Sequence, residues 1–241
     1  MSRTVVVTGG TAGIGHRVAR RFAESGDSVV ITGRSTERVQ QAAAELGVRG
    51  IVCDAGVPAA VARFAELLGP EVDVLVNAAG GNTDLTAGEP DAPSLEKLAE
   101  RWQANLTANL LSAVLTTTAL RDRFRTGGSV INIGSIGAEY AASSYGAAKA
   151  ALEAWSAGLS AQLAPTGITV NTVAPGYIED TEFFQGTMTD QRRAQLIGAT
   201  HNNRAGTPDD VAGLIEFLAS PHARHLTGQT LHLNGGAYTT R

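Results

Sequence analysis

The side chains in this 241-residue sequence that most clearly suggest chemistry are Tyr145 and Lys149, four residues apart in the stretch SYGAAKAAL. At that spacing the two side chains share one face of a helix. A free tyrosine has a pKa of ~10 and is a poor base near pH 7, but an ammonium within ~4 to 6 Å favours the phenolate. The chain has only one other lysine, Lys97, so chance is a poor explanation for the pair. The spacing therefore predicts a group that moves a proton in ketone reduction or alcohol oxidation.

Ser135 could complete this chemistry. It stands ten residues before Tyr145, just after the apolar run of residues 129–133, and its hydroxyl could hold the substrate oxygen beside the tyrosine. An ordinary turn or helix-cap role is the alternative. The ammonium of Lys149 has three donors, enough to hold a cofactor ribose as well.

Two rival chemistries lack their motifs. The sequence IGSIG around Ser135 is not the G-x-S-x-G elbow of a serine hydrolase, and no histidine occupies a comparable place. The five histidines form no ligand set, since His222 and His225 lack nearby carboxylate or thiol partners and are expected at a helix end or on the surface. No metal site is predicted.

A glycine-rich turn follows the first apolar run. Residues 8–15 read TGGTAGIG, with Gly9, Gly13 and Gly15 in a G-x-x-x-G-x-G spacing. Glycines let the backbone turn sharply, and free N–H groups at a helix N-terminus attract a pyrophosphate. A plain tight turn is the alternative, but the position after a strand favours a dinucleotide site contacted by Gly9, Thr11, Gly13, Ile14 and Gly15.

The ends of the next strands predict which dinucleotide binds. The second run ends in TGRS with no acidic residue, so Arg34 could pair with a 2′-phosphate, which favours NADP(H) while leaving NAD(H) possible. The alternative is that Arg34 is only a solvated residue before a helix. Asp54 follows the third run and could accept from the adenine amino group, and Asn77 ends the fourth.

Strand-like and helix-like segments alternate along the whole chain. The apolar runs cover residues 4–8, 28–32, 50–53, 72–76, 129–133, 168–173 and 230–233, and the helical patterns cover 14–25, 35–46, 57–68, 94–125, 144–164 and 208–219. This alternation predicts an α/β fold: a Rossmann-type doubly wound parallel sheet of about seven strands with helices on both faces. We expect residues 1–241 to form one NAD(P)-binding domain.

Residues 177–203 are expected to form an irregular, mobile lid. The segment is rich in Thr, Gly and Gln but also carries Tyr177, Phe183, Phe184 and Met188, which favours an apolar or ring-containing substrate.

Composition excludes several classes of protein. Hydrophobic residues make up 43% and charged residues 17%, the net charge is −4, and no apolar run approaches the ~20 residues that span a bilayer. The single Cys53 lies in an apolar run, which indicates a core residue and a cytoplasmic protein. Because the arginines are scattered and form no basic stripe, we expect no nucleic-acid partner. Because no apolar run is long enough to span a bilayer, we expect no membrane partner.

The ordered motifs resemble those of the short-chain dehydrogenase/reductase family, from residue 5 to residue 236. They are TGGTAGIG at 8–15, CDA at 53–55, NAAG at 77–80, YGAAK at 145–149, PG at 175–176 and TGQTLHLNGG at 227–236. The resemblance is to the short-subunit branch, similar to 3-oxoacyl-ACP reductase-like ketoreductases. It implies a bound nicotinamide cofactor and a homo-oligomer, either a dimer or a tetramer.

The resemblance also implies roles for individual residues. Ser135, Tyr145 and Lys149 would be catalytic, together with an asparagine that holds a water for the lysine. Asn109 is the choice over Asn105, because Trp102 precedes it by the usual seven residues. The cofactor contacts implied in addition to those above are Ala55, Ala78, Pro175, Gly176, Ile178 and Thr181.

The sequence departs from the family pattern in several places. The separation of Ser135 and Tyr145 is ten rather than the more usual thirteen, Ala12 replaces a basic residue often found in NADPH-preferring members, and Thr166 stands where carrier-protein reductases often have arginine. Ala12 weakens the argument for NADP(H) from Arg34, and Thr166 argues against a carrier-protein substrate. We expect a small-molecule carbonyl or alcohol substrate and an NADP(H)-dependent carbonyl reductase. The alternatives are an NAD-dependent secondary alcohol dehydrogenase and, from another class, a non-catalytic NAD(P)-binding regulator.

Overall fold

The structure, a computed structural model, describes residues 2–85 and 94–240. Seven parallel strands form one sheet in the order β3-β2-β1-β4-β5-β6-β7, which confirms the doubly wound α/β fold. The strands are β1 (Thr4–Thr8), β2 (Ser28–Gly33), β3 (Arg49–Val52), β4 (Val72–Asn77), β5 (Phe124–Ile133), β6 (Thr169–Pro175) and β7 (Thr230–Leu233).

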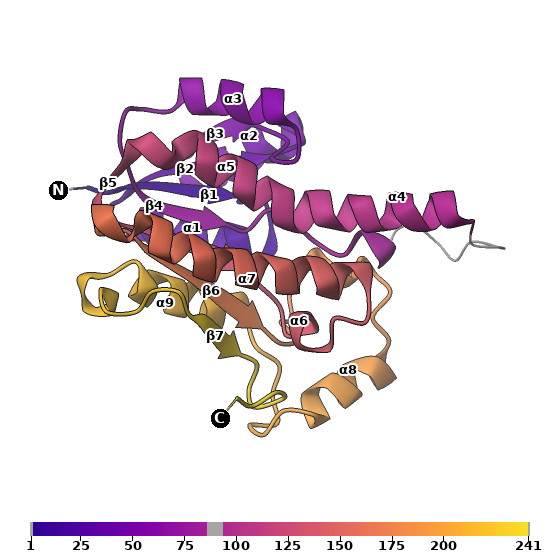
Figure 1. The fold of residues 1–241 in the computed structure, drawn as a ribbon. Helices are drawn as coiled ribbons and strands as arrows, with labels where there is room; N and C mark the ends of the chain where they lie inside the picture. Colours follow the sequence, from indigo (N-terminus) through magenta and orange to yellow (C-terminus); the bar gives the residue numbers. More distant parts are fainter. Residues whose placement is uncertain (1, 86–93, 241) are drawn as a thin grey trace.

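Helices cover both faces of the sheet because successive strand residues point to opposite faces. The longer helices are α1 (Gly13–Glu24), α2 (Thr36–Leu46), α3 (Pro58–Leu67), α4 (Leu95–Leu106), α5 (Ser112–Leu120), α7 (Ser144–Leu163), α8 (Asp190–Gly198) and α9 (Pro208–Leu218). Val5 and Val7 share a core cluster with residues of α1, α2 and α9, whereas Val6 shares one with residues of α3, α5 and α7. Figure 1 shows these helices on the two sides of the sheet.

The helix predicted over residues 94–125 is interrupted and ends early. A π-helical turn, Thr107–Leu111, separates α4 from α5, and β5 already begins at Phe124. Phe124 pairs with Val72, but Arg125 and Thr126 are exposed, so the first half of β5 has no apolar alternation that the sequence could reveal.

The segment 177–203 is less irregular than expected. It contains a short 3-10 turn, Glu182–Phe184, and the nine-residue helix α8. Thr189 caps α8 by accepting from the Arg192 N–H at 3.1 Å. No residue of α8 is buried, so the apolar periodicity that usually reveals a helix is missing, although the Thr-Asp cap signal was present.

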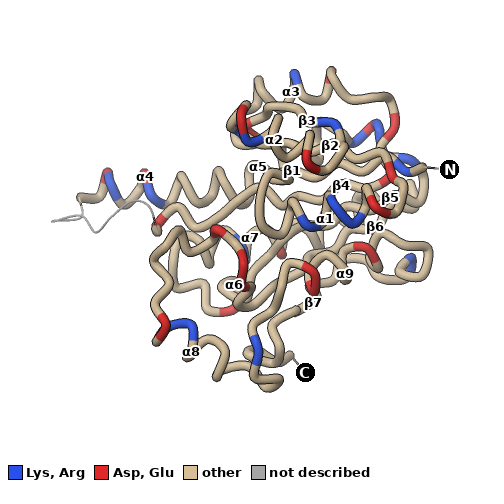
Figure 2. Tube along the Cα trace, turned by 180° about the vertical axis from the view of Figure 1, so that it is seen from behind, with Lys and Arg blue, Asp and Glu red and all other residues tan. Residues whose placement is uncertain are grey.

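The carboxyl ends of the parallel strands meet at one edge. In Figure 1 the short helix α6 (Gly137–Tyr140) and α8 lie beyond the ends of β6 and β7, while α4 projects past the sheet. Figure 2 shows acidic and basic residues interspersed along the described chain. Among the described residues no helix could span a bilayer, and no His, Cys, Asp and Glu cluster could hold a metal ion.

Candidate active site

The predicted glycine turn joins β1 to α1 in a conformation that depends on its glycines. Gly9 and Gly13 have φ of +66° and +53°. A Cβ on Gly15 would lie 2.4 Å from the Gly9 carbonyl oxygen, so the turn has no room for a side chain there. The N-terminus of α1 has no side-chain cap and no acidic residue in its first turn among the described residues, a combination that suits an anion.

The end of β2 lies directly beside this turn. A Cβ on Gly33 would come within 2.7 Å of the Thr11 methyl group. The next residue, Arg34, is exposed where the cofactor ribose is expected. Sequence reasoning missed a second cation there: Arg38 on α2 pairs with Glu182 of segment 177–203 at 2.7 Å. Only the fold brings these two residues together, because they are 144 positions apart.

Two other predicted cofactor residues have their side chains engaged inside the protein. Asp54 accepts from the Gly56 N–H at 2.9 Å, next to the buried Ala55. Asn77 donates to Thr117 Oγ1 at 3.0 Å and to Asn132 Oδ1 at 2.8 Å. The side chain of Asn77 therefore ties β4 to α5 and β5.

The residues after β6 return toward the glycine turns. Pro175 accepts from the Ile136 N–H at 2.9 Å, and Gly176 donates to the Leu233 carbonyl at 3.0 Å. Further on, Thr181 lies close enough to Gly13 that a Cβ on the glycine would be 3.6 Å from it. Ile178 is buried, and the Ala78 carbonyl oxygen would lie 2.8 Å from a Cβ on Gly9. The sheet edge thus brings the predicted cofactor residues from β1, β4 and β6 into one neighbourhood.

The shortened loop between Ser135 and Tyr145 still brings their side chains together. It contains the single-turn helix α6, and a Cβ on Gly146 would lie 2.6 Å from the Gly137 carbonyl, so α6 packs tightly on the start of α7. Ser135 Oγ accepts from the Gly137 N–H at 3.0 Å, and a Cβ on Gly137 would lie 3.3 Å from Ser135 Oγ and 3.4 Å from the Tyr145 ring, so the two side chains flank the same glycine. Both hydroxyls can therefore reach one substrate oxygen.

Lys149 is buried one helical turn after the tyrosine. Its ammonium donates to the Ile133 carbonyl at 2.7 Å and lies 5.8 Å from the centroid of the Tyr145 ring. Burial lowers the pKa of Lys149 to about 8, and the nearby Glu153 carboxyl opposes that shift. The lysine thus titrates much closer to neutral pH than an exposed one.

The expected lowering of the tyrosine pKa does not appear in this structure. Burial raises the pKa of Tyr145 to about 12, and the hydrogen bond from Ser135 only partly opposes it. The ring is 9% exposed and lies 5.5 Å from the ring of Phe183. Because the ammonium faces the Ile133 carbonyl, desolvation outweighs its attraction for a phenolate.

Asn105 and Asn109 are both buried around the π-helical turn and differ in their partners. Asn109 donates to the Gly81 carbonyl at 2.9 Å and accepts from the Gly81 N–H at 3.0 Å, so it holds the chain after β4. Asn105 donates to Ser144 Oγ at 2.8 Å at the start of α7. The extra residue of a π turn often marks a functional site, and the sequence pattern did not reveal it.

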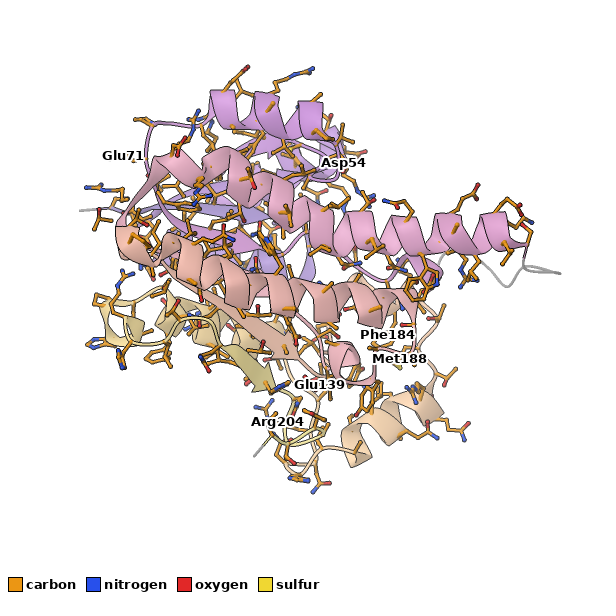
Figure 3. The ribbon with its side chains drawn as sticks, viewed as in Figure 1. Asp54, Glu71, Glu139, Phe184, Met188 and Arg204 are labelled. Carbon is orange, nitrogen blue, oxygen red and sulfur yellow. The ribbon has the colours of Figure 1, made fainter. Side chains whose placement is uncertain are left out.

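Aromatic side chains from segment 177–203 gather over the tyrosine. Phe183 and Phe184 have ring centroids 5.0 Å apart, and Tyr177 lies 5.9 Å from Phe184. Figure 3 shows the side chains of Phe184 and Met188 on the stretch between β6 and α8. Phe183 therefore lies beside Tyr145, and Phe184 and Tyr177 extend this aromatic group away from it.

Sequence reasoning also missed a group of titratable side chains next to Lys149. Glu153 follows it on α7, and Glu139 of α6 lies 3.5 Å from His232 of β7. Three separate elements contribute these residues, so only the i+4 spacing from Lys149 to Glu153 was available as a signal.

The fold places the chain among Rossmann-type α/β proteins, and comparison with known families defines it further. A family model described as enoyl-(acyl carrier protein) reductase matches residues 9–238. A 3-oxoacyl-[acyl-carrier-protein] reductase of Vibrio cholerae is 32% identical over 246 residues, covering 98% of this chain and 97% of that protein. An acetoacetyl-CoA reductase of Allochromatium vinosum is 32% identical over 254 residues, covering 99% of both. The chain therefore belongs to the short-chain dehydrogenase/reductase family and is an oxidoreductase acting on carbonyl or alcohol groups.

Solved structures agree with this assignment. A blue fluorescent protein from a metagenomic library, in complex with NADPH, superimposes with a TM-score of 0.85 at 32% identity, covering 98% of each chain. A short-chain dehydrogenase from Burkholderia cenocepacia in complex with NADP gives a TM-score of 0.84 at 32% identity, covering 98% of this chain and 97% of that one.

Proposed function

We propose that the protein is an NADP(H)-dependent carbonyl reductase that also works in reverse as a secondary alcohol dehydrogenase. The observation that carries this proposal is that the side chains of Ser135 and Tyr145 flank the same glycine, Gly137, with Lys149 one turn away. The names of the similar 3-oxoacyl-[acyl-carrier-protein] and acetoacetyl-CoA reductases support carbonyl chemistry.

In the proposed reduction the protein orients the carbonyl and supplies the proton. Ser135 Oγ holds the substrate oxygen, and the Tyr145 hydroxyl donates its proton to that oxygen as negative charge develops there. The charge of Lys149 favours the resulting phenolate, which then regains a proton from solvent. Asn109, which holds the chain after β4, is the proposed site of a relay water. When bound, the nicotinamide would supply the hydride to the carbonyl carbon.

The residues at the sheet edge fit a dinucleotide. The glycine turn leaves α1 uncapped for a pyrophosphate, and Arg34 and Arg38 are both on the β2 side, where a 2′-phosphate would lie. NADP and NADPH in the similar structures support the same cofactor. Gly9, Gly15, Asp54, Ala55 and Ala78 would contact the adenosine and pyrophosphate, and Pro175, Gly176, Ile178 and Thr181 the nicotinamide.

Segment 177–203 is proposed to be the substrate lid. Phe183 covers the Tyr145 ring, so a substrate must displace it to reach the hydroxyl. The surrounding Tyr177, Phe184 and Met188 support an apolar or ring-containing carbonyl compound.

We further propose that the protein is a homo-oligomer, a dimer or a tetramer. Leu95, Leu98 and Trp102 form an exposed apolar stripe on α4, 80%, 47% and 41% exposed. The exposed side of α7 carries small residues that permit close helix contact: Ala154, Ala157, Gly158 and Ala161.

We also propose a cytoplasmic location. The single cysteine of the chain, Cys53, is buried, which fits a reducing compartment.

Oxidation of NADPH and of NADH against cyclic ketones, 3-oxoacyl thioesters, quinones and an enoyl thioester tests the proposed reaction. NADPH turnover with at least one ketone is expected, and Tyr145→Phe should lower kcat by about 10³-fold or more while cofactor affinity stays within a few-fold. Turnover with NADH alone would identify an NAD-dependent enzyme. Cofactor binding without any turnover, or a fully active Tyr145→Phe variant, would contradict the mechanism.

Replacement of Arg34 tests the cofactor preference. Arg34→Ala should raise KM for NADPH by roughly 10-fold, because it removes one charge-assisted hydrogen bond to the 2′-phosphate. KM for NADH should stay nearly unchanged, because NADH lacks that phosphate. The exposed Arg63 on α3 provides a matched control, because Arg63→Ala removes the same charge away from the site. Equal losses with both cofactors would show that Arg34 does not select the 2′-phosphate.

The two buried asparagines give a ranked prediction. Asn109→Ala should lower turnover more than Asn105→Ala, because Asn109 is proposed to hold the relay water, whereas Asn105 bonds to Ser144. Comparison of kcat under cofactor saturation, with unfolding midpoints measured in parallel, separates the catalytic effect from any loss of stability. The reverse ranking at equal stability would assign the relay to Asn105.

A further inference from the structure

Glu153 occupies a site beside the catalytic groups that is built around its carboxyl. It lies one turn after Lys149 on α7 and extends into space left by Gly134, the residue after β5. A Cβ on Gly134 would be 2.8 Å from Glu153 Oε1 and 2.7 Å from the Thr172 methyl group. A glycine at this position is therefore what gives the carboxyl its place.

Glu153 lies close to two candidate catalytic residues, Lys149 and Ser135. Its carboxyl lies against Gly134, the residue before Ser135, and its charge raises the pKa of the Lys149 ammonium. Oε1 is buried and has no hydrogen-bond partner among the described residues. A buried acceptor without a partner is costly, so a structural role alone is a poor reason for a carboxyl here.

Other titratable groups face this carboxyl from α6 and the C-terminal part of the chain. Glu139 of α6 repels it; Glu139 Oε1 in turn lies 3.5 Å from His232 Nε2, and Glu139 raises the pKa of Tyr238. From its own helix, Lys149 attracts it. Gly134, directly after β5, and Thr172 of β6 lie on the side of the sheet.

These surroundings set the order of ionisation. Burial and, after it, the charge of Glu139 raise the pKa of Glu153 to about 7, against the opposing effects of the Ser135 N–H and Lys149. Burial lowers the pKa of Lys149 to about 8. Glu153 is therefore mostly ionised in the range where Lys149 begins to lose its proton, and its negative charge delays that loss.

We propose that Glu153, held in the gap at Gly134 one turn after Lys149, is a positioning residue whose ionised carboxylate keeps Lys149 charged. Its effect on Lys149 is a property of the protein alone, whereas its effect on turnover rests on the proposed function. As pH rises, the carboxylate forms first and extends the range over which the lysine stays an ammonium. Loss of the carboxylate shortens that range from its alkaline side.

Lysine-selective ¹³C labelling tests the first part directly, because the chain has only two lysines. The ¹³Cε signals of Lys97 and Lys149 are followed from pH ~6 to ~11, and Lys97→Arg assigns them. Glu153→Gln keeps the shape of the side chain but removes the charge, and should lower the pKa of Lys149 by roughly 0.5 to 1 unit. The exposed Lys97 is the internal reference and should not shift.

The matched control is Glu66→Gln, which removes the same charge from the exposed side of α3. It should leave the titration of Lys149 unchanged. An unchanged Lys149 titration in a folded Glu153→Gln variant, or an equal shift in Glu66→Gln, would overturn the proposal. If Glu153→Gln does not fold, Glu153→Met serves instead: it fills the same space without a charge, so the pKa of Lys149 should again fall, and an unchanged value would overturn the proposal.

The kinetic consequence is measured separately. In Glu153→Gln the alkaline limb of the kcat/KM profile should move to lower pH by the same interval as the lysine titration, a change that a purely structural role would not produce. An unmoved limb despite a shifted lysine would contradict the role in turnover. Absence of wild-type turnover would defeat the proposed function, and the lysine titration would still decide the role of Glu153.

Discussion

The site depends on one buried positive charge. Lys149 is 5% exposed, and an ammonium in such a place is costly unless other groups stabilise it. The Ile133 carbonyl does so directly at 2.7 Å, because β5 ends there and leaves that oxygen free to accept. Glu153 adds the opposite charge in the gap at Gly134. Three parts of the chain thus stabilise the ammonium of Lys149: the end of β5, the glycine after it and one face of α7.

The remaining groups are positioned around that charge by the parallel sheet. Because all seven strands run in the same direction, their carboxyl ends bring residues distant in sequence to one edge. Ser135 follows β5, Asn109 holds the chain after β4, and Thr181 approaches the glycine turn after β1. The buried bond from Asn77 to Asn132 fixes β4 against β5 beneath them.

The parts of this arrangement that the sequence revealed are those encoded locally. The i+4 spacing of Tyr145 and Lys149 needs only a helix, and the apolar runs of the strands need only two covered faces. The sequence could not reveal the Arg38 to Glu182 pair or the contact of Glu139 with His232, because these join elements far apart in the chain. It also missed α8, whose residues are not buried, and the π turn around Asn109. The pKa of Tyr145 moved opposite to expectation because burial under Phe183 depends on the folded chain.

Transfer of deuterium from NADPH labelled at C4 is the most direct measurement of the central claim, that this edge reduces a carbonyl. The protein is incubated with each of the two stereospecifically labelled cofactors and a cyclic ketone, and the product alcohol is analysed by mass spectrometry. Deuterium should appear on the carbinol carbon with one labelled cofactor and not with the other, since the site fixes one face of the nicotinamide. Alcohol without deuterium from either cofactor, or bound cofactor with no alcohol formed from any ketone, would contradict the claim.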